Sequence, residues 1–143
     1  MTELYIDGVE QSTSNGNNWN RSDYIGLPPM GRLIALKANN SADPLCAGVL
    51  ASTFEAYALT NSNSWRCTSS NDDVDWTFLG YDDSSWPYAV QYGSNGEGHT
   101  NCTQGLQLIT DIDPNAQWIW TSNPSTDDVV YCRGYLRECK ICW

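Results

Sequence analysis

The stretch Leu79–Val90, with the sequence LGYDDSSWPYAV, carries the strongest local structural signals of this chain. The paired aspartates and serines at 82–85 have short polar side chains that bond neighbouring backbone groups, so they favour a turn over a strand. Pro87 lacks a backbone N–H and pushes the residue before it toward extended geometry, so it favours the start of a strand. The sequence therefore predicts a tight polar turn that directs the indole of Trp86 into the core.

Other segments alternate apolar and polar residues over short stretches that end at turn residues. Residues 3–11 show this pattern around an Asp-Gly hairpin signal, and residues 32–38 are apolar on both faces, as expected of an inner strand. In the segment Trp118–Trp120 the strand period places both indoles on one face and Ile119 on the other, but it does not show which face belongs to the core. Further strands are expected at residues 64–67, 88–92, 106–109, 117–121 and 129–136. Because no segment shows a clear helical period, the sequence predicts a single all-β sandwich domain over residues 1–143.

Several of these segments together resemble a known family. They are DDSSWP at 82–87, AQWIW at 116–120, VYCR at 130–133, LYIDGV at 4–9 and LIALKA at 33–38. These motifs are similar to those of galactose-binding-domain-like jelly-roll modules, the sugar-binding β-sandwiches attached to many glycoside hydrolases and extracellular proteins. The resemblance implies a jelly-roll β-sandwich, two strands at residues 47–52 and 55–60, and a non-catalytic accessory role. It also implies that the Trp118–Trp120 segment is structural, so we expect both of its indoles to belong to the core.

The order of the segments departs from the family pattern. LYIDGV comes first in this chain, whereas a strand of that kind follows the Y-x-R segment in the family. Either the module is circularly permuted, or the chain begins part-way through a longer protein and closes the sandwich with strands from its other end. Both alternatives predict that the two termini are adjacent.

The chain is acidic throughout its length. Seven Lys and Arg residues stand against seventeen Asp and Glu residues, which gives a formal net charge of −10. Nucleic acids and anionic membranes are bound by clustered positive charge, so we expect neither as a partner. No stretch approaches the roughly 20 apolar residues that span a bilayer, so no membrane insertion is expected.

Six cysteines in a chain with one histidine favour disulfides over a metal site. The expected pairs are Cys46 with Cys67, which would join two proposed strands, and Cys102 with Cys132, which would tie a long loop to the VYCR strand. Cys139 and Cys142 lie in a C-terminal tail, residues 137–143, where they either close on each other or cross-link to a neighbouring molecule.

Three N-glycosylation sequons point to the same oxidising route, at Asn20, Asn39 and Asn101. Together with the cysteines they predict a secreted or extracellular glycoprotein. Met1-Thr2-Glu3 has neither the basic start nor the apolar core of a signal peptide. We therefore expect that a leader has been removed or that the chain is cut from a longer precursor.

The sequence offers little for catalysis. His99 lies in a Gly- and Asn-rich loop, no Gly-x-Ser-x-Gly elbow is present, and Cys139–Cys142 is a lone Cys-x-x-Cys motif. A glycosidase pair of carboxylates is not excluded by spacing alone, because the chain has many aspartates. With the non-catalytic role that the resemblance implies, we expect no enzyme and no cofactor.

One acidic segment raises the question of a structural calcium ion. Asp72, Asp73 and Asp75 offer clustered hard oxygen ligands, although their spacing is not that of an EF-hand loop. The alternative is a solvated acidic turn.

Two functions remain open from the sequence. Seven Trp and eight Tyr residues against two Phe provide amphipathic rings that suit sugars and protein surfaces, unless most of the Trp residues fill the core. The first hypothesis is a lectin-like, carbohydrate-binding module that binds glycans or glycoproteins. Its candidate ligand-binding residues come from two loops, with Trp19, Arg21 and Asp23 in one and Tyr92, Asn95 and His99 in the other. The second is a structural subunit of an extracellular filament, appendage or coat that binds copies of itself through shared strands or disulfides.

Overall fold

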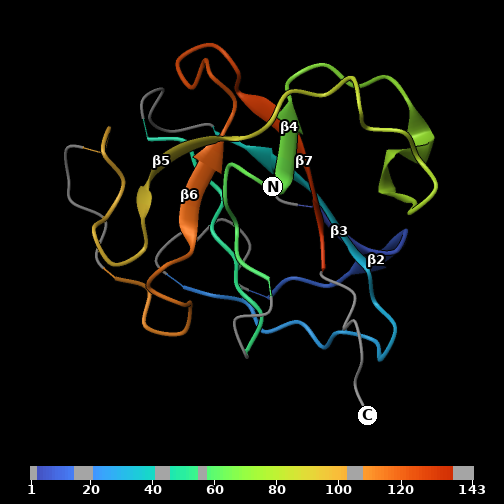
Figure 1. Ribbon diagram of the computed structural model, residues 1–143, viewed down its shortest axis with the longest axis horizontal. Coiled ribbons are helices and arrows are strands. Elements are labelled where there is room, and N and C mark those ends of the chain that lie inside the picture. Colours follow the sequence, from blue (N-terminus) through green and yellow to red (C-terminus); the bar gives the residue numbers. More distant parts are fainter. Residues whose placement is uncertain (1–2, 15–20, 41–45, 55–57, 103–107, 137–143) are drawn as a thin grey trace.

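The computed structural model describes residues 3–14, 21–40, 46–54, 58–102 and 108–136. In this part of the chain, the sole helix is the short 3₁₀ helix η1 (Val74–Thr77), and the sheets are antiparallel (Figure 1). One sheet has the order β2 (Val9–Gln11), β1 (Glu3–Ile6), β3 (Leu33–Asn39), β7 (Val129–Tyr135), β4 (Trp65–Thr68), and the other pairs β5 (Val90–Ser94) with β6 (Gln117–Trp120). The all-β prediction is confirmed.

None of the described segments forms a helix of the length and apolarity that crossing a bilayer requires.

Strand β3 is the centre of the five-stranded sheet. It pairs with β1 on one side and with β7 on the other. Leu33, Ala35 and Leu36 are buried, so both faces of β3 are covered, as predicted for an inner strand. Within the described residues, the first and last strands, β1 and β7, thus flank the same strand. The predicted adjacency of the termini themselves falls on residues 1–2 and 137–143, outside the described residues.

Strands β1 and β2 form the predicted hairpin. Asp7 and Gly8 both have left-handed backbone angles, with φ of 47° and 83°, as a two-residue turn that matches strand twist requires. The Asp7 carboxylate accepts hydrogen bonds from the backbone N–H groups of Arg32 and Leu33. The turn is therefore fastened to the start of β3.

The smaller sheet is extended by isolated bridges rather than by the two expected strands at 47–52 and 55–60. Val49 and Ile119 exchange two backbone hydrogen bonds, at 2.9 and 3.0 Å, and Ser52 bridges Leu59. Around this bridge, the Thr60 N–H donates to the Ala51 carbonyl at 3.0 Å and the Thr53 N–H to the Ala58 carbonyl at 2.9 Å, and the Thr60 hydroxyl bonds backbone groups of Ala51 as well. Residues 55–57 lie outside the described part of the chain.

Two other strand predictions differ from the structure. The strand expected at 88–92 begins at Val90, because Tyr88 bridges Arg66 on the outer edge of β4 instead of pairing with β6. Residues 108–109 of the strand expected at 106–109 are not in a strand, and the rest of that segment lies outside the described residues.

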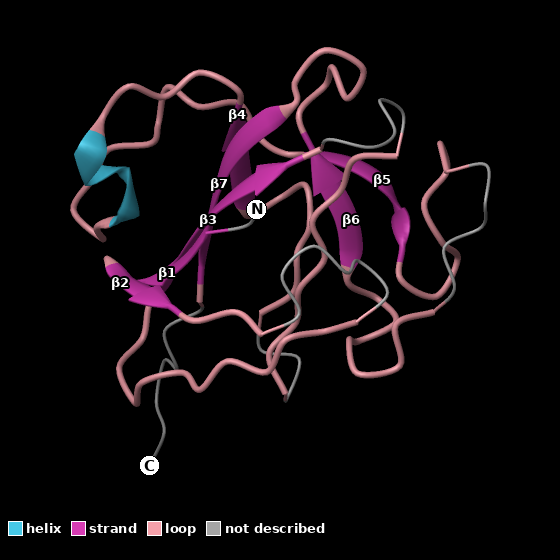
Figure 2. Cartoon of the chain, turned by 180° about the vertical axis from the view of Figure 1, so that it is seen from behind, coloured by secondary structure: helices cyan, strands magenta, loops and turns pink. Residues whose placement is uncertain are grey.

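The two sheets share one hydrophobic core. Ile119 and Trp120 of β6 pack in the same cluster as Leu36 of β3 and Val130 of β7, and Figure 2 shows β5 and β6 beside the five-stranded sheet. Trp118 is buried as well, so the core prediction for both indoles is confirmed.

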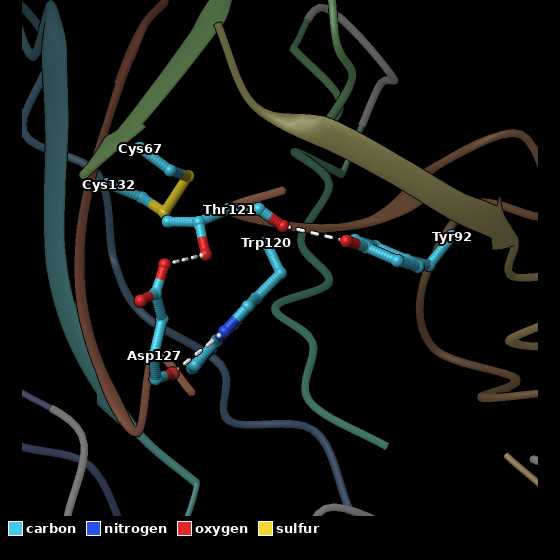
Figure 3. Close-up of a disulfide and its surroundings, with 6 residues drawn as sticks. All are labelled: Cys67, Tyr92, Trp120, Thr121, Asp127 and Cys132. Carbon is cyan, nitrogen blue, oxygen red and sulfur yellow. Dashed lines mark hydrogen bonds between the residues drawn. A yellow bond between two sulfur atoms is a disulfide. The ribbon is translucent and has the colours of Figure 1, made fainter. Parts of the chain in front are cut away.

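The predicted cysteine pairing is wrong. The disulfides join Cys67 to Cys132 and Cys46 to Cys102. Cys67 and Cys132 stand directly opposite each other on β4 and β7, with their Cα atoms 4.2 Å apart, and they pack in one cluster with Trp120 (Figure 3). Chain order alone does not show that β4 pairs with β7 in this register. The expected bonds of Cys139 and Cys142 lie outside the described residues.

The turn at 82–86 has the predicted form. Asp82 accepts a hydrogen bond from the Ser84 N–H at 3.0 Å, and the Trp86 N–H donates to the Asp83 carbonyl at 2.9 Å. The Trp86 indole is buried against Trp76. The prediction that this turn drives an indole inward is confirmed.

The same turn carries a buried ion pair into the sheet. Arg133 of β7 is 0% exposed, and its Nε donates to Asp83 Oδ2 at 2.8 Å. Asp83 also lies 3.8 Å from Arg66 Nε on β4. The remaining Arg133 nitrogens donate to backbone carbonyls of the preceding loop, those of Trp76, Phe78 and Tyr81. One carboxylate therefore ties the turn to two strands.

Gly134 of β7 lies directly against the indole of Trp65, its partner on β4. A Cβ atom at Gly134 would overlap three ring carbons of Trp65, so a side chain must displace the ring or the strand. Gly134→Ala is expected to lower the free energy of unfolding by about 1–3 kcal/mol, measured by urea denaturation. Gly80→Ala is the control, because no atom lies within 4 Å of its added Cβ. Equal stability of the two variants would contradict this prediction.

Candidate functional site

The first predicted ligand loop is partly described. Trp19 lies outside the described residues, as does the sequon residue Asn20. Arg21 is exposed. Asp23 is half-buried, and its Oδ1 accepts hydrogen bonds from the backbone N–H and the hydroxyl of Ser14, at 2.8 and 2.6 Å. Asp23 therefore closes the base of this loop.

Asn95, from the second predicted loop, is an internal support. Its side chain is 1% exposed, and its Nδ2 donates to the carbonyls of Ile109 and Ile112 at 2.9 and 2.8 Å. Its Oδ1 accepts from the Ile109 N–H at 3.0 Å. Both ends of the amide thus hold the backbone of the turn at residues 109–113.

His99 is 5% exposed and is held in one tautomer. Its Nδ1 accepts a hydrogen bond from the Asn101 N–H at 3.2 Å, so the proton lies on Nε2, which donates to the Ala47 carbonyl at 3.0 Å. The imidazole stacks on Tyr92 with a centroid distance of 5.3 Å and meets Trp118 edge to face. Burial lowers the pKa of His99, against a weaker opposing effect of the Ala47 carbonyl.

Tyr92 also has an internal partner. Its ring is half-buried and its hydroxyl donates to the Thr121 carbonyl at 2.7 Å (Figure 3). Burial, followed by the charge of Asp127, raises the pKa of Tyr92. The second predicted loop therefore contributes scaffold contacts through all three of its candidate side chains.

The structure instead brings an exposed aromatic ring and a carboxylate together from distant parts of the chain. The Tyr24 side chain is 76% exposed, and interaction of its hydroxyl with Asp111, then desolvation and the Asp111 charge, raises the pKa of Tyr24. Ser22 Oγ donates to Asp111 Oδ2 at 3.0 Å. We call Arg21, Ser22, Tyr24 and Asp111 the Tyr24–Asp111 surface.

No protein-family model matches this chain, and neither does any curated protein or solved structure at a significant level.

The turn that presents Asp111 is fixed from beneath. Asn95 holds residues 109–113, and Ser52 Oγ accepts a hydrogen bond from the Asp113 N–H at 3.0 Å. The Asp113 carboxylate in turn accepts from the Asn115 N–H at 2.7 Å. The two predicted loops therefore meet at this turn: one contacts it through Ser22 and the other supports it through Asn95.

Sequence reasoning missed Tyr24 and Asp111. The Ser22 and Asp111 partners are separated by 89 positions, a distance at which no local pattern links two loops. The available signal was a tyrosine in a polar, non-periodic segment that ends at Gly26 and a double proline.

The acidic residues considered for calcium form a capped turn. Among the described residues, no group of three or more His, Cys, Asp or Glu side chains is placed so that it could hold a metal ion. Asp72, Asp73 and Asp75 therefore do not form such a group. Asp73 is the N-cap of η1 and accepts a hydrogen bond from the Asp75 N–H at 2.9 Å. All three aspartates are exposed.

Two of the sequon asparagines are accessible. Asn39 at the end of β3 and Asn101 beside the Cys46–Cys102 disulfide are exposed. Their hydroxyl partners, Ser41 and Thr103, lie outside the described residues. Glycan attachment at these positions stays a prediction.

His99 gives a testable pH dependence. Its pKa in the folded protein lies below the ordinary value of 6.5, so the unfolded chain binds this proton first as the pH falls. The contribution of neutral His99 to the free energy of unfolding is complete above about pH 6.5. It is lost as the pH falls from there through the folded-state pKa, by at most about 1.4 kcal/mol per pH unit. Urea unfolding between about pH 7.5 and about pH 5 measures this loss.

The control for this prediction is His99→Gln, which keeps an amide donor for the Ala47 carbonyl and does not titrate. Carboxylates titrate equally in both proteins, so the difference between the two stability curves isolates the histidine. Parallel curves over the whole range would contradict the prediction.

Proposed function

We propose that this protein is a secreted, non-catalytic carbohydrate-binding module with a galactose-binding-domain-like jelly-roll fold, and that sugar binds at the Tyr24–Asp111 surface. The observation that carries the proposal is the exposed Tyr24 ring next to Asp111, which raises the pKa of Tyr24 and accepts a hydrogen bond from Ser22 Oγ. A pyranose C–H face packs on such a ring, while its hydroxyls donate to the neighbouring carboxylate. Loops placed on a rigid sheet scaffold are the usual position for sites of this kind.

The family assignment is supported by contacts between the segments that carry the resemblance. Asp83 of DDSSWP bonds Arg133 of VYCR at 2.8 Å. The LYIDGV strand pairs directly with the LIALKA strand. These segments form one structural unit despite their unusual order, which is what a permuted module requires.

Extracellular location is supported by the two disulfides. Such bonds form and persist in oxidising compartments.

The non-catalytic part of the proposal is supported by His99, the one histidine of the chain. It is buried with both ring nitrogens hydrogen bonded, so it has no free nitrogen to act as a general base.

The filament alternative receives less support from the described sheet edges. Strand β4 is one edge of the five-stranded sheet. Along β4, the Cys67 N–H donates to the Pro87 carbonyl and the Ala89 N–H to the Trp65 carbonyl. Backbone groups that are already bonded do not template a strand from another molecule, so we favour the binding module.

The test is a glycan array probed with the full chain and with variants of Tyr24. Tyr24→Ala is expected to weaken binding to the sugars that the protein recognises by about ten-fold or more, because it removes the stacking surface. Tyr24→Phe keeps the ring and is expected to retain much of the binding.

Tyr88→Ala is the matched control. Tyr88 is also an exposed tyrosine, but its ring lies 4.3 Å from the Arg66 guanidinium, on the edge of β4. The proposed function is contradicted if no glycan binds. The proposed location is contradicted if Tyr88→Ala reduces binding as much as Tyr24→Ala does.

A further inference from the structure

We propose that the His99 imidazole and the Cys46–Cys102 disulfide form a coupled acid- and redox-sensitive switch, in which protonation of the ring makes this disulfide easier to reduce. The ring and the disulfide join the same two segments of the chain, residues 46–47 and 99–102. This inference does not depend on sugar binding, so its failure would leave the proposed function in place.

The side-chain hydrogen bonds of His99 go to the chain neighbours of the two cysteines. Nε2 donates to the carbonyl of Ala47, the residue after Cys46, at 3.0 Å. Nδ1 accepts at 3.2 Å from the N–H of Asn101, the residue before Cys102. The first bond crosses between the two segments, and the second fixes the orientation and the tautomer of the ring. We call the neutral ring with these two hydrogen bonds the His99 bridge.

The position of the ring suits only its neutral form. The ring is 5% exposed, stacks on Tyr92 of β5 and meets Trp118 of β6 edge to face. A Cβ atom at Gly48 would lie 2.9 Å from Trp118 and 3.3 Å from the His99 ring, so the packing leaves little room for a different orientation. A protonated Nδ1 cannot accept from a backbone N–H, and burial disfavours the charge. A ring that takes up a proton must therefore move toward water.

Few charged groups face the ring from the elements packed against it. Tyr92 of β5 is titratable, and burial raises its pKa further above the acidic range. Trp118 of β6 and residues 46–48 carry no charge, and the Glu97 carboxylate of the same loop is exposed, where water and salt screen it. Desolvation lowers the pKa of His99 despite the opposing hydrogen bond to a backbone carbonyl. Burial of the ring is therefore the main control on its protonation.

The redox step is an exchange with a dithiol reductant. The disulfide takes up two electrons and two protons and becomes two thiols, while the dithiol gives up the same and becomes a cyclic disulfide. The closer the reduced protein keeps its two thiols, the more the exchange favours the protein disulfide, because the effective concentration of the thiols is higher. Cys46 and Cys102 are half-buried, so they are partly exposed to such a reductant.

The His99 bridge raises this effective concentration. While the ring is neutral, its bond to the Ala47 carbonyl keeps Cys46 beside Cys102 after reduction. When the ring takes up a proton and leaves, that bond is lost and the thiols can separate. Linkage is reciprocal, so reduction must in turn favour protonation of the ring. The pKa of His99 is therefore expected to rise toward its ordinary value of 6.5 when the disulfide is opened.

The first experiment measures the exchange equilibrium between the full chain and dithiothreitol at about pH 7.5 and about pH 5, approached from both the oxidised and the reduced side. Both sides of the exchange carry the same two protons below the thiol pKa values, so the thiols themselves add no pH dependence. Alkylation and peptide mass spectrometry give the reduced fraction of Cys46–Cys102 under conditions that leave Cys67–Cys132 intact. The equilibrium constant for reduction is expected to be about three-fold or more larger at the lower pH.

His99→Gln is the matched control. It keeps an amide donor for the Ala47 carbonyl and does not titrate, so its equilibrium constant is expected to lack this increase. Any effect of pH on the carboxylates of the fold is common to both proteins and cancels in the comparison.

The second experiment leaves His99 unchanged, so it decides the matter even if His99→Gln does not fold. His99 is the one histidine of the chain, so its ring gives the only imidazole signals in an NMR titration. The pKa of His99 is expected to be higher in the Cys46→Ala and Cys102→Ala double variant than in the oxidised protein. An equal pKa in the two proteins, or an equal effect of pH on reduction with and without the imidazole, overturns the inference.

Discussion

Replacing Asp83 with alanine is expected to lower the free energy of unfolding by about 3–5 kcal/mol, because it leaves a buried guanidinium without its counter-charge. Arg133 is fully buried, and Asp83 is its carboxylate partner at 2.8 Å. Nearby carbonyls accept from the remaining Arg133 nitrogens but do not neutralise the charge. Urea denaturation of Asp83→Ala and of the unchanged protein measures the loss.

The neighbouring aspartate provides a matched control. Asp82 is exposed and accepts one hydrogen bond, from the Ser84 N–H. Asp82→Ala is expected to cost no more than about 1 kcal/mol. A similar loss for Asp82→Ala and Asp83→Ala would show that the turn, and not the ion pair, accounts for the stability.

Removal of the Cys67–Cys132 disulfide by a double alanine substitution is expected to cost about 4 kcal/mol. The bond closes a segment with a sequence separation of 65, and its loss releases that constraint on the unfolded chain. Both cysteines are fully buried and pack with Trp120, so their removal also leaves a small cavity that costs about 1 kcal/mol.

The other disulfide separates these two contributions. Cys46–Cys102 spans a similar separation of 56, so the chain-entropy part of its loss is nearly the same. Its cysteines are only half-buried, so alanine leaves less of a cavity. The Cys46→Ala and Cys102→Ala double variant is therefore expected to be the more stable of the two. The opposite order would contradict the cavity argument.

Local chemistry in the sequence was enough to predict several parts of the fold. The turn at 82–86, the burial of Trp86 and the hairpin at Asp7-Gly8 each depend on residues a few positions apart. The inner strand at 33–38 was visible because both of its faces are apolar. In each case the physical cause acts within one turn or one strand.

Features that depend on the register between distant strands could not be predicted in this way. The cysteine pairs follow from β4 lying next to β7, and chain order alone does not show this neighbour. Ser22 and Asp111 meet because a loop near the start of the chain contacts a turn near its end. Local patterns identify the pieces of such a surface but not which pieces come together.

The Asn95 amide has a consequence for how the presented surface can vary. It bonds backbone atoms of Ile109 and Ile112, so the backbone of this turn is held from inside the protein. Thr110, Asp111 and Asn115 point outward from a backbone that is held from inside. Substitutions at Thr110 and Asp111 can therefore change the exposed chemistry of the turn while the Asn95 amide still holds its backbone. The turn is a natural place to diversify in a library that seeks new binding specificities on this scaffold.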